Sequence, residues 1–323
     1  MKPVIGIPRS LMYHFYSDSL ELFFKELGYS IKISPVSNKE ILNHGSKLTM
    51  LDNCLPVKLH FGHVLSLINR VDYLFIPRLV SLKKREYMCP KFIGIPDLIK
   101  QTFPEYSAKL IEPTINYNEN KTFLKSLTDI KNSLDLSTWK ILKAFFKAKT
   151  AYHKTIKFRK KQFTESVNSY KANSTGPRIG IIGHDYVLED KLLGVPIKSK
   201  LHELGCIIYP STDLKWLPQK ESAKAMPKDL YWTKNKALFE SAIYLSKKGL
   251  IDGLIQINTF PCGPDSVISD LIDRKINHLN PLPTMTLTLD EHTGLSGLHT
   301  RIEAFIDLIN RRGSREPYSP SHG

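Results

Sequence analysis

The sequence lacks long apolar runs and clustered cysteines, and each absence excludes a class of protein. No apolar run approaches the roughly 18–20 residues that a membrane-spanning helix needs. The N-terminal "MKPVIGIPRS" enters a strand-like run without the charged and apolar regions of a secretory signal peptide. Only four cysteines occur in 323 residues, which is too few and too scattered for a disulfide framework. We therefore expect a cytoplasmic protein that does not insert into membranes.

Two common cofactor motifs are also missing. The sequence has no G-x-x-x-x-G-K-[ST] phosphate loop, so we do not expect the chain to hydrolyse ATP by itself. Zinc sites usually contain C-x-x-C pairs, whereas Cys54, Cys89 and Cys262 are separated by 35 and 173 residues. A local zinc motif is therefore absent.

Positive charge is abundant but unevenly spread. The net charge is +15, and the segment 140–171 holds ten Lys or Arg and one acidic residue, Glu165. Apolar residues fall roughly on one helical face of this segment, namely Leu142, Phe145, Phe146, Tyr152, Ile156 and Phe163. This pattern predicts a helix that covers a domain and keeps its lysines in solvent; a surface that binds an anion or a partner is the alternative. No helix-turn-helix or RNA-binding aromatic pattern supports a nucleic-acid partner.

One α/β pattern occurs twice along the chain. The strand-like runs "PVIGIP" (3–8) and "RIGIIG" (178–183) each lead into a helix that ends in Glu-Leu-Gly and then into a second strand. Gly28 and Gly205 occupy the expected C-cap positions of these helices. The later runs "VDYLFIP" and "IDGLIQI" also match, and they are typical of central parallel strands buried on both faces.

These matches predict two α/β domains with parallel sheets. We expect the first domain at 1–116 and the second at 177–312. A basic helical connector is expected over 117–176, and a disordered tail over 313–323.

Three cysteines lie where parallel sheets place their ligand sites, at the carboxyl ends of strands or on the way to them. Cys54, Cys89 and Cys262 each have a proline within two residues. Because proline fixes φ, each thiol is presented from a stiff loop. Cys206 differs, since it lies inside the strand-like "CIIYP" and is typical of a buried structural thiol.

The spacing leaves several roles open for the three thiols. Nucleophilic catalysis requires a base, and His60, His63 and His184 are candidates, but no triad pattern marks one of them. An iron–sulfur cluster held by three thiolates is chemically sensible, because an iron without a cysteine ligand can bind an external ligand or a substrate oxygen. Scattered structural cysteines are the remaining alternative.

Other polar residues are expected near the same edges. Arg9 follows the first strand, where it either contacts an anionic ligand or is an ordinary loop charge. Lys58 is expected on the thiol's side of the helix that follows Cys54, and His63 further along is more typical of a structural histidine. Asp265 and Ser266 are candidates to cap the next helix. The segment "DEHTG" (290–294) offers an acid or base, or a capping loop.

Several long segments carry a family resemblance and occur in order: "IGIPRSLMYHFY", "SPVSNKEILNHG", "CLPVKLHFGHV", "VDYLFIPRLVSLKKREYMCPKFIGIPD", "QINTFPCGPDS" and "PLPTMTLTLDEHTG". Together they resemble the acyl-CoA dehydratase activase-related family, which is similar in turn to the 2-hydroxyacyl-CoA dehydratase and benzoyl-CoA reductase subunits. The likeness covers nearly the whole chain apart from the middle helices and the tail.

The resemblance implies two Rossmann-like domains with an iron–sulfur cluster in the cleft between them. The implied ligands are Cys54, Cys89 and Cys262, and the implied cluster is 4Fe–4S or, as in some relatives, of the double-cubane type. Residues expected around the cluster are Arg9, Lys58, His63, His184 and Ser266. The implied role is low-potential electron transfer or reductive chemistry on a small or CoA-linked substrate. An ATP-dependent activator or an electron donor would be the partner.

Two points leave alternatives open. The segment "GHDY" (183–186) stands where many relatives read Gly-His-Pro-Tyr, and the activity of the family is itself poorly defined. The chain is therefore either an enzyme resembling the reductases and dehydratases or a non-catalytic docking partner of an activator. Nucleic-acid binding through the basic helix ranks last, and a homodimer is compatible with each role.

Overall fold

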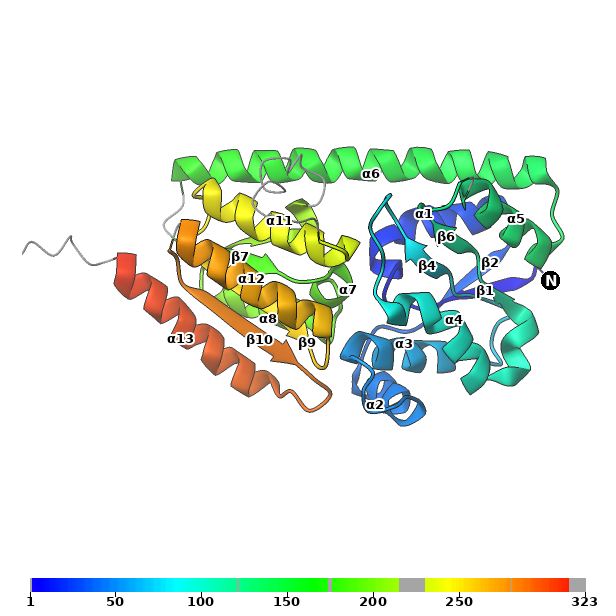
Figure 1. Cartoon of the computed structure of the whole chain (residues 1–323), viewed down its shortest axis with the longest axis horizontal. Coiled ribbons are helices and arrows are strands. Elements are labelled where there is room, and N and C mark those ends of the chain that lie inside the picture. The colour runs from blue at the N-terminus through cyan, green and yellow to red at the C-terminus, as the bar shows by residue number, and fades with distance from the viewer. Residues whose placement is uncertain (1, 121, 174–175, 215–229, 280, 314–323) are drawn as a thin grey trace, which may run out of the picture.

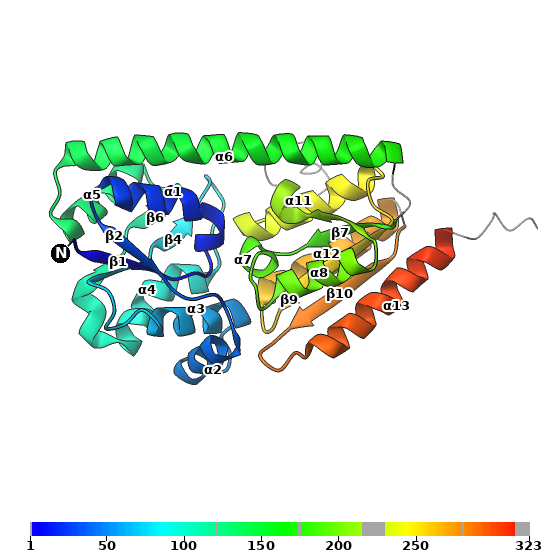
Figure 2. The ribbon, with the colours of Figure 1, turned by 180° about the vertical axis from the view of Figure 1, so that it is seen from behind.

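The computed structural model describes residues 2–120, 122–173, 176–214, 230–279 and 281–313, and each half of the chain is built on a parallel sheet (Figures 1 and 2). The predicted α/β class with parallel sheets is confirmed. The tail expected at 313–323 lies outside the described residues, apart from its first residue. None of the helices in these ranges combines the length and apolar character needed to cross a membrane.

The first sheet has the strand order β2-β1-β3-β5, with all neighbours parallel. Its strands are β1 (Val4–Ile7), β2 (Ser30–Ile33), β3 (Tyr73–Phe75) and β5 (Leu110–Ile111). A separate pair of parallel strands, β4 (Arg78–Ser81) and β6 (Thr114–Asn116), lies beside it. Side chains alternate across β1, where Ile5 and Ile7 are buried on one face and Gly6 allows Val71 and Leu74 to pack closely on the other.

Helices cover both faces of the first sheet, as a central parallel sheet requires. They are α1 (Tyr13–Glu26), α2 (Lys39–Leu48), α3 (Leu55–Leu65), α4 (Pro90–Thr102), the 3-10 helix η1 (Pro104–Lys109) and α5 (Thr122–Leu134). One hydrophobic cluster joins the sheet to α1, α5 and α6, and a second joins it to α3 and α4.

The second sheet has the order β10-β9-β7-β8, again with parallel neighbours. Its strands are β7 (Arg178–Ile182), β8 (Ile207–Pro210), β9 (Gly253–Thr259) and β10 (Thr284–Leu289). Its helices are α7 (Asp185–Leu188), α8 (Gly194–Glu203), α9 (Ser211–Leu214), α11 (Thr233–Lys247), α12 (Gly263–Leu279) and α13 (Leu295–Gly313). The helices α8 and α13 bury one face, and α11 and α12 bury the other.

The basic segment forms one long helix, α6 (Thr138–Asn173), which runs along both halves (Figures 1 and 2). Ile141, Ala144 and Ala148 are buried against the first half, and Phe163 packs with the core of the second half. The helix therefore covers the fold as predicted. The expectation that Phe146 faces the core was wrong, because 58% of this side chain is exposed.

The two halves also contact each other directly. Ile41 and Leu42 of α2 and Leu55 and Leu59 of α3 belong to the same hydrophobic cluster as β7, α8 and α13. The backbone N–H of Leu55 donates to the carbonyl of Phe260, 3.2 Å away, and so joins the start of α3 to the loop after β9. This junction brings the three proline-flanked cysteine segments to one region.

Candidate functional site

Each of the three predicted thiols lies immediately before a helix. Cys54 precedes α3, Cys89 precedes α4 and Cys262 precedes α12. Cys54 and Cys89 have almost the same backbone conformation, with φ and ψ of −68° and 154° for the first and −67° and 154° for the second. A proline in the first two helical positions favours this start, because its fixed φ suits the first turn and the N–H it lacks would have no partner there. The prolines next to the cysteines thus set how the thiols are held.

Backbone N–H groups of the following helices lie near these sulfurs. The backbone of Val57 acts to lower the pKa of Cys54, that of Phe92 the pKa of Cys89, and that of Asp265 the pKa of Cys262, although neither Cys54 nor Cys89 makes a side-chain hydrogen bond that caps its helix. The first N–H groups of a helix carry partial positive charge. The helix starts therefore favour negative charge on each sulfur, but this effect is smaller than the opposing effect of burial.

All three thiols affect the pKa of the Tyr186 phenol. Burial raises its pKa well above the usual value, and Asp265 and the three cysteines Cys89, Cys262 and Cys54 act on it electrostatically in the same direction. Cys54 is in electrostatic reach of Cys89 and of Cys262 as well. Thiols from both halves of the chain are thus within electrostatic reach of one tyrosine phenol.

Burial favours the protonated form of all three thiols. Burial raises the pKa of Cys54 to about 11 and also raises that of Cys89. Burial and the carboxylate of Asp265 raise the pKa of Cys262. Cys206 is separate from this group: it is buried in the core between β8, α8 and α13, as its sequence context predicted.

Asp265 organises the polar side of the thiol cluster. Its Oδ1 accepts hydrogen bonds from His184 Nε2 at 2.7 Å and from Asn235 Nδ2 at 2.9 Å. Burial alone would raise the pKa of Asp265, but the contacts with His184, Cys262 and Asn235 lower it overall. Asp265 was expected to cap α12, but it lies within the first turn and holds side chains from two other elements.

The hydrogen-bonded pair of His184 and Asp265 contains two polar atoms without a hydrogen-bond partner in the described part of the chain. His184 Nδ1 and Asp265 Oδ2 are both buried without a hydrogen bond. The imidazole of His184 stacks on the ring of Tyr186, with centroids 4.8 Å apart and planes 16° apart. Buried polar atoms without partners are uncommon and call for an explanation.

A small cavity of about 220 Å³ adjoins His184 between the halves. Its lining includes Asp185, Thr233 and Lys234 from the second half and Tyr16 from α1. Lys234 is ion-paired with Asp185, with an Nζ–Oδ2 distance of 3.1 Å, and burial lowers its pKa. Sequence analysis missed both residues; the only available signal was that "GHDY" follows the carboxyl end of a predicted strand.

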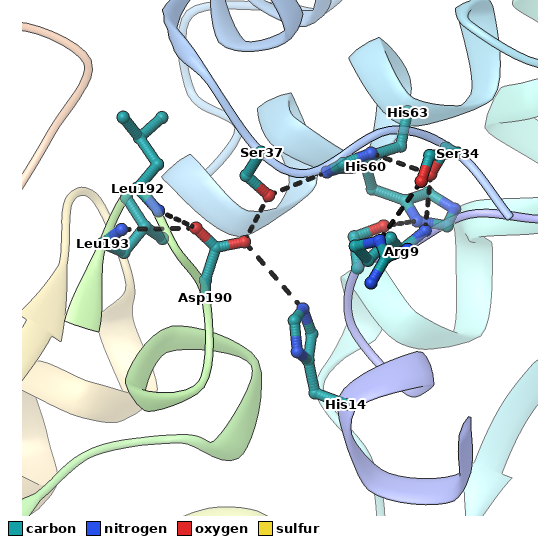
Figure 3. A network of polar contacts seen from close by, with 10 residues as sticks. Arg9, His14, Ser34, Ser37, His60, His63, Asp190, Leu192 and Leu193 are labelled. Carbon is teal, nitrogen blue, oxygen red and sulfur yellow. Dashed lines mark hydrogen bonds and ion pairs between the residues drawn. The ribbon is translucent and has the colours of Figure 1, made fainter. Parts of the chain in front are cut away.

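A polar network that also joins the halves contains two of the predicted site residues (Figure 3). His63 is hydrogen-bonded through Nδ1 to Ser34 Oγ at 2.9 Å and through Nε2 to Ser37 Oγ at 3.0 Å. The backbone N–H of Arg9 donates to Ser34 Oγ at 2.7 Å. Arg9 and His63 therefore contact this network, and none of their hydrogen bonds between described residues goes to a thiol.

Asp190 supplies the part of the network that comes from the second half. Its Oδ2 accepts a hydrogen bond from Ser37 Oγ and lies 3.9 Å from His14 Nε2 of α1. Its Oδ1 accepts the backbone N–H groups of Leu192 and Leu193, at 2.8 and 3.2 Å (Figure 3). One carboxylate thus ties the loop after α7 to the first half.

The remaining predicted neighbours have different partners. Lys58 was expected to face the Cys54 thiol, but its ammonium group is ion-paired with Glu291 of the second half at 2.5 Å. Its side chain is only 3% exposed and that of Glu291 is 20% exposed. Ser266 donates from Oγ to the backbone carbonyl of Cys262 at 3.1 Å. Within "DEHTG", Glu291 is thus the residue that forms an ion pair with the first half.

The three thiols do not share a compact site for one metal ion with each other or with nearby His, Asp or Glu side chains among the described residues. Within the described ranges, no three His, Cys, Asp or Glu side chains come together closely enough to hold one metal ion.

Comparison with known proteins identifies the family. No curated protein matches the chain. The C-terminal domain of glucosamine-fructose-6-phosphate aminotransferase from Francisella tularensis is similar at 12% identity over 96% of this chain and 84% of that chain, with a TM-score of 0.27. A putative phosphosugar isomerase from Silicibacter pomeroyi DSS-3 is similar at 9% identity over 97% and 86% of the two chains, with a TM-score of 0.21. TM-scores this low support no argument about function.

A family model gives the decisive match. The model described as the CoA enzyme activase uncharacterised domain matches residues 4–214. Cys54 and Cys89 fall inside the matched segment, and Cys262 lies beyond it. Since the match covers more than half of the chain, this protein belongs to the family of the CoA enzyme activase uncharacterised domain.

Proposed function

We propose that this chain is an iron–sulfur redox protein in which Cys54, Cys89 and Cys262 bind the cluster between the two halves. The observation that carries the proposal is that three thiols from both halves, each at the start of a helix, lie within electrostatic reach of Tyr186. Membership of a CoA enzyme activase family supports a place in the chemistry of CoA-linked substrates.

The donor set suits a polynuclear cluster better than a single ion. Cysteine thiolates are the usual ligands of iron–sulfur clusters. In such a cluster each thiolate binds a different iron, so the ligands need not converge on one point. Cys54 lies within electrostatic reach of both Cys89 and Cys262, which is compatible with thiolates that bind different irons of one cluster. The helix N-termini behind the sulfurs favour the negative charge that thiolates and a reduced cluster carry.

The surrounding residues would position and shield the site. Asp265 accepts hydrogen bonds from His184 and Asn235 and contacts Cys262, which fixes this thiol to the second half. Tyr186 packs against Phe92 as well as His184 and so excludes water between the two halves. The bound cluster would supply low-potential one-electron chemistry.

The substrate is proposed to be a small molecule or the acyl end of a CoA-linked one. The cavity of about 220 Å³ beside His184 has room for a group of that size. His184 Nδ1 and Thr233 Oγ1 are buried, have no hydrogen-bond partner among the described residues, and belong to residues that line the cavity. Both atoms would be available to orient a polar substrate group.

Anaerobic purification or reconstitution tests the cluster directly. We expect iron and sulfide in the wild-type protein and a paramagnetic resonance signal after reduction. Cys54→Ala, Cys89→Ala and Cys262→Ala should each lose most of the iron. Cys206→Ala is the matched control, because this thiol lies in the core outside the thiol cluster, and this variant should keep its cluster.

Two outcomes would contradict the proposal. If the reconstituted wild-type protein binds neither iron nor sulfide, the chain does not hold an iron–sulfur cluster. Equal iron retention in Cys262→Ala and Cys206→Ala would show that the site is not shared between the halves.

A docking role is the second candidate, and the exposed face of α6 favours it. Trp139 and Phe158 on this helix are 78% and 61% exposed amid the lysines. An acidic activator or electron donor would fit such a surface by charge. Reversing the charges of Lys157, Arg159, Lys160 and Lys161 should abolish capture of such a partner and leave iron content unchanged. Capture that survives the reversal would exclude α6 as the docking surface.

A further inference from the structure

The first half contains a large, partly open cavity in addition to the cavity beside His184. The volume of the large cavity is about 580 Å³. It separates the two hydrophobic clusters of that half: Leu11 and Ile95 line it from one cluster, and Phe23, Phe75 and Leu127 line it from the other. The cavity thus lies between α1, α5 and the sheet, on the side that α6 covers.

A space of this size is not an ordinary packing defect. Protein interiors are close-packed, and voids larger than a water molecule are few. Side chains that line an empty space lose dispersion contacts on that side. Ligand sites, by contrast, are typically apolar cavities of about 300–1,000 Å³ with a few placed polar groups. Both the volume and the lining match a binding site.

One polar side chain in the lining lacks a partner. His60 is 6% exposed, and its Nδ1 is hydrogen-bonded to Ser10 Oγ at 2.8 Å. Its Nε2 is buried with no hydrogen bond to any described residue. Burial lowers the pKa of His60 to about 4, so the imidazole is neutral at physiological pH and its Nε2 offers either a lone pair or an N–H.

The charge around the cavity narrows the class of ligand. Lys149 and His153, which line it from α6, are exposed to solvent, and no charged side chain is buried in the lining. An anion bound beside the neutral His60 would lose its hydration without a counter-charge, which is costly. A hydroxyl group suits Nε2 in either tautomer, because it both donates and accepts.

We propose that this cavity is a binding site for a mostly apolar molecule that carries one uncharged hydroxyl or carbonyl oxygen, with His60 Nε2 as its hydrogen-bond partner. The ring-rich walls, which include Tyr16, Phe23, Phe75 and Phe92, suit an aromatic body as well as an aliphatic one. The cavity shares Phe92 with the surroundings of Cys89 and Tyr16 with the cavity beside His184, but the proposed binding does not require a bound cluster.

A pair of shape-matched probes tests this assignment. The probes p-ethylphenol and p-ethyltoluene differ in a hydroxyl against a methyl group, and binding is followed by calorimetry and by the shift in melting temperature. The full-length wild-type protein should bind both, the phenol more tightly. His60→Leu should weaken binding of the phenol roughly fivefold to tenfold, as expected for one neutral hydrogen bond, and leave p-ethyltoluene unchanged.

Filling the cavity should remove binding of both probes. Ala148→Phe places a ring in the cavity from α6, and Ser19→Phe does so from α1, so that one variant serves if the other does not fold. Ala151→Phe on α6 is a control outside the lining. The proposal is overturned if the wild-type protein binds neither probe or if His60→Leu weakens both equally. Binding of p-ethylbenzoate as tight as that of the phenol would overturn the uncharged class.

Discussion

The two halves share a strand order but differ in how their cores are filled. In each sheet the first strand lies between the second and the third, and the fourth follows the third. The N–H of Val4 donates to Asp72 Oδ2 at 2.7 Å, and that of Arg178 donates to Asp252 Oδ2 at 2.8 Å. An aspartate at the equivalent position, Asp72 or Asp252, thus fixes the start of the first strand in each half.

The helix ends are equivalent as well. Gly28 has φ of +91° and Gly205 has φ of +71°, and each closes the helix between the first two strands. The N–H of the residue after each glycine reaches back to the carbonyls of Phe24 and Leu201, which is the Schellman pattern. The repeat found in the sequence is therefore a repeat of physical contacts.

The differences concern length and space. The third strand has three residues in the first half and seven in the second. The first half adds the α2–α3 pair and the small β4–β6 sheet, supplies two of the three thiols, and encloses the cavity of about 580 Å³. The first half therefore carries most of the candidate binding features, while the second provides a regular sheet and one thiol.

The largest expected loss of stability concerns the contact between α2 and α3 in the first half. The described part of the second half has no equivalent of this helix pair. A Cβ added to Gly62 would collide with the backbone carbonyl of Ile41. Because backbone cannot move aside cheaply, Gly62→Ala should destabilise the first half by about 3 kcal/mol or more. Hydrogen exchange resolved by half should show faster exchange there first.

The helical Gly94 provides the control for this variant. A Cβ at Gly94 meets open space, so Gly94→Ala should be neutral or stabilise α4 by up to about 1 kcal/mol. Similar exchange rates in Gly62→Ala and Gly94→Ala would show that α2 and α3 separate without cost.

A smaller effect should follow from the ion pair that joins the halves. Glu291→Gln leaves the ammonium group of Lys58 buried without its counter-charge, and we expect a loss of about 2 kcal/mol in the free energy of unfolding. Denaturant titration measures this loss. Glu303→Gln, which removes the partner of the exposed pair with Lys200, is the matched control. Equal denaturation midpoints for Glu291→Gln and Glu303→Gln would show that the ion pair between Lys58 and Glu291 does not stabilise the contact between the halves.

The smallest effect per residue is a pH dependence that belongs to the first half. Burial lowers the pKa of His60 to about 4 and that of His63 to about 3, against 6.5 in the unfolded chain. The unfolded state therefore binds more protons below pH 6.5, and stability falls as the pH falls toward the folded-state values. Each group should cost about 1.5 kcal/mol between pH 6.5 and 5.

Denaturant midpoints at these two pH values measure the dependence. His63→Gln should reduce it by the share of one group, whereas replacement of the exposed His153 by Gln should leave it unchanged. A pH dependence that His63→Gln does not alter would show that this histidine is protonated in the folded protein.

Local patterns were sufficient for the elements and for the presentation of the thiols. Alternating and continuous apolar runs predicted the central strands, and glycine marked the helix ends. Prolines beside Cys54, Cys89 and Cys262 predicted stiff loops, and each thiol does lie at a helix start. The amphipathic pattern of α6 was weaker, because a helix that covers two halves changes its buried face along its length, and Phe146 was misplaced.

The polar partners could not be predicted, because they are distant in the chain. His184 and Asp265 are 81 residues apart, and Lys58 and Glu291 are 233 apart. No local spacing distinguishes such residues from ordinary surface charges. The position of Lys58 on its helix suggested the thiol as its neighbour, but ion pairing with the second half determines where the side chain points.

The sequence by itself determined the repeated parallel α/β pattern, the covering helix and the stiff mounting of three thiols, because periodicity, glycine and proline act over a few residues. Only the tertiary structure decided that the three thiols come within electrostatic reach of Tyr186, that Asp190 and Glu291 tie the halves together, and that the first half contains a large cavity. Convergence and empty volume depend on how whole elements pack against each other, and no short stretch of sequence encodes them.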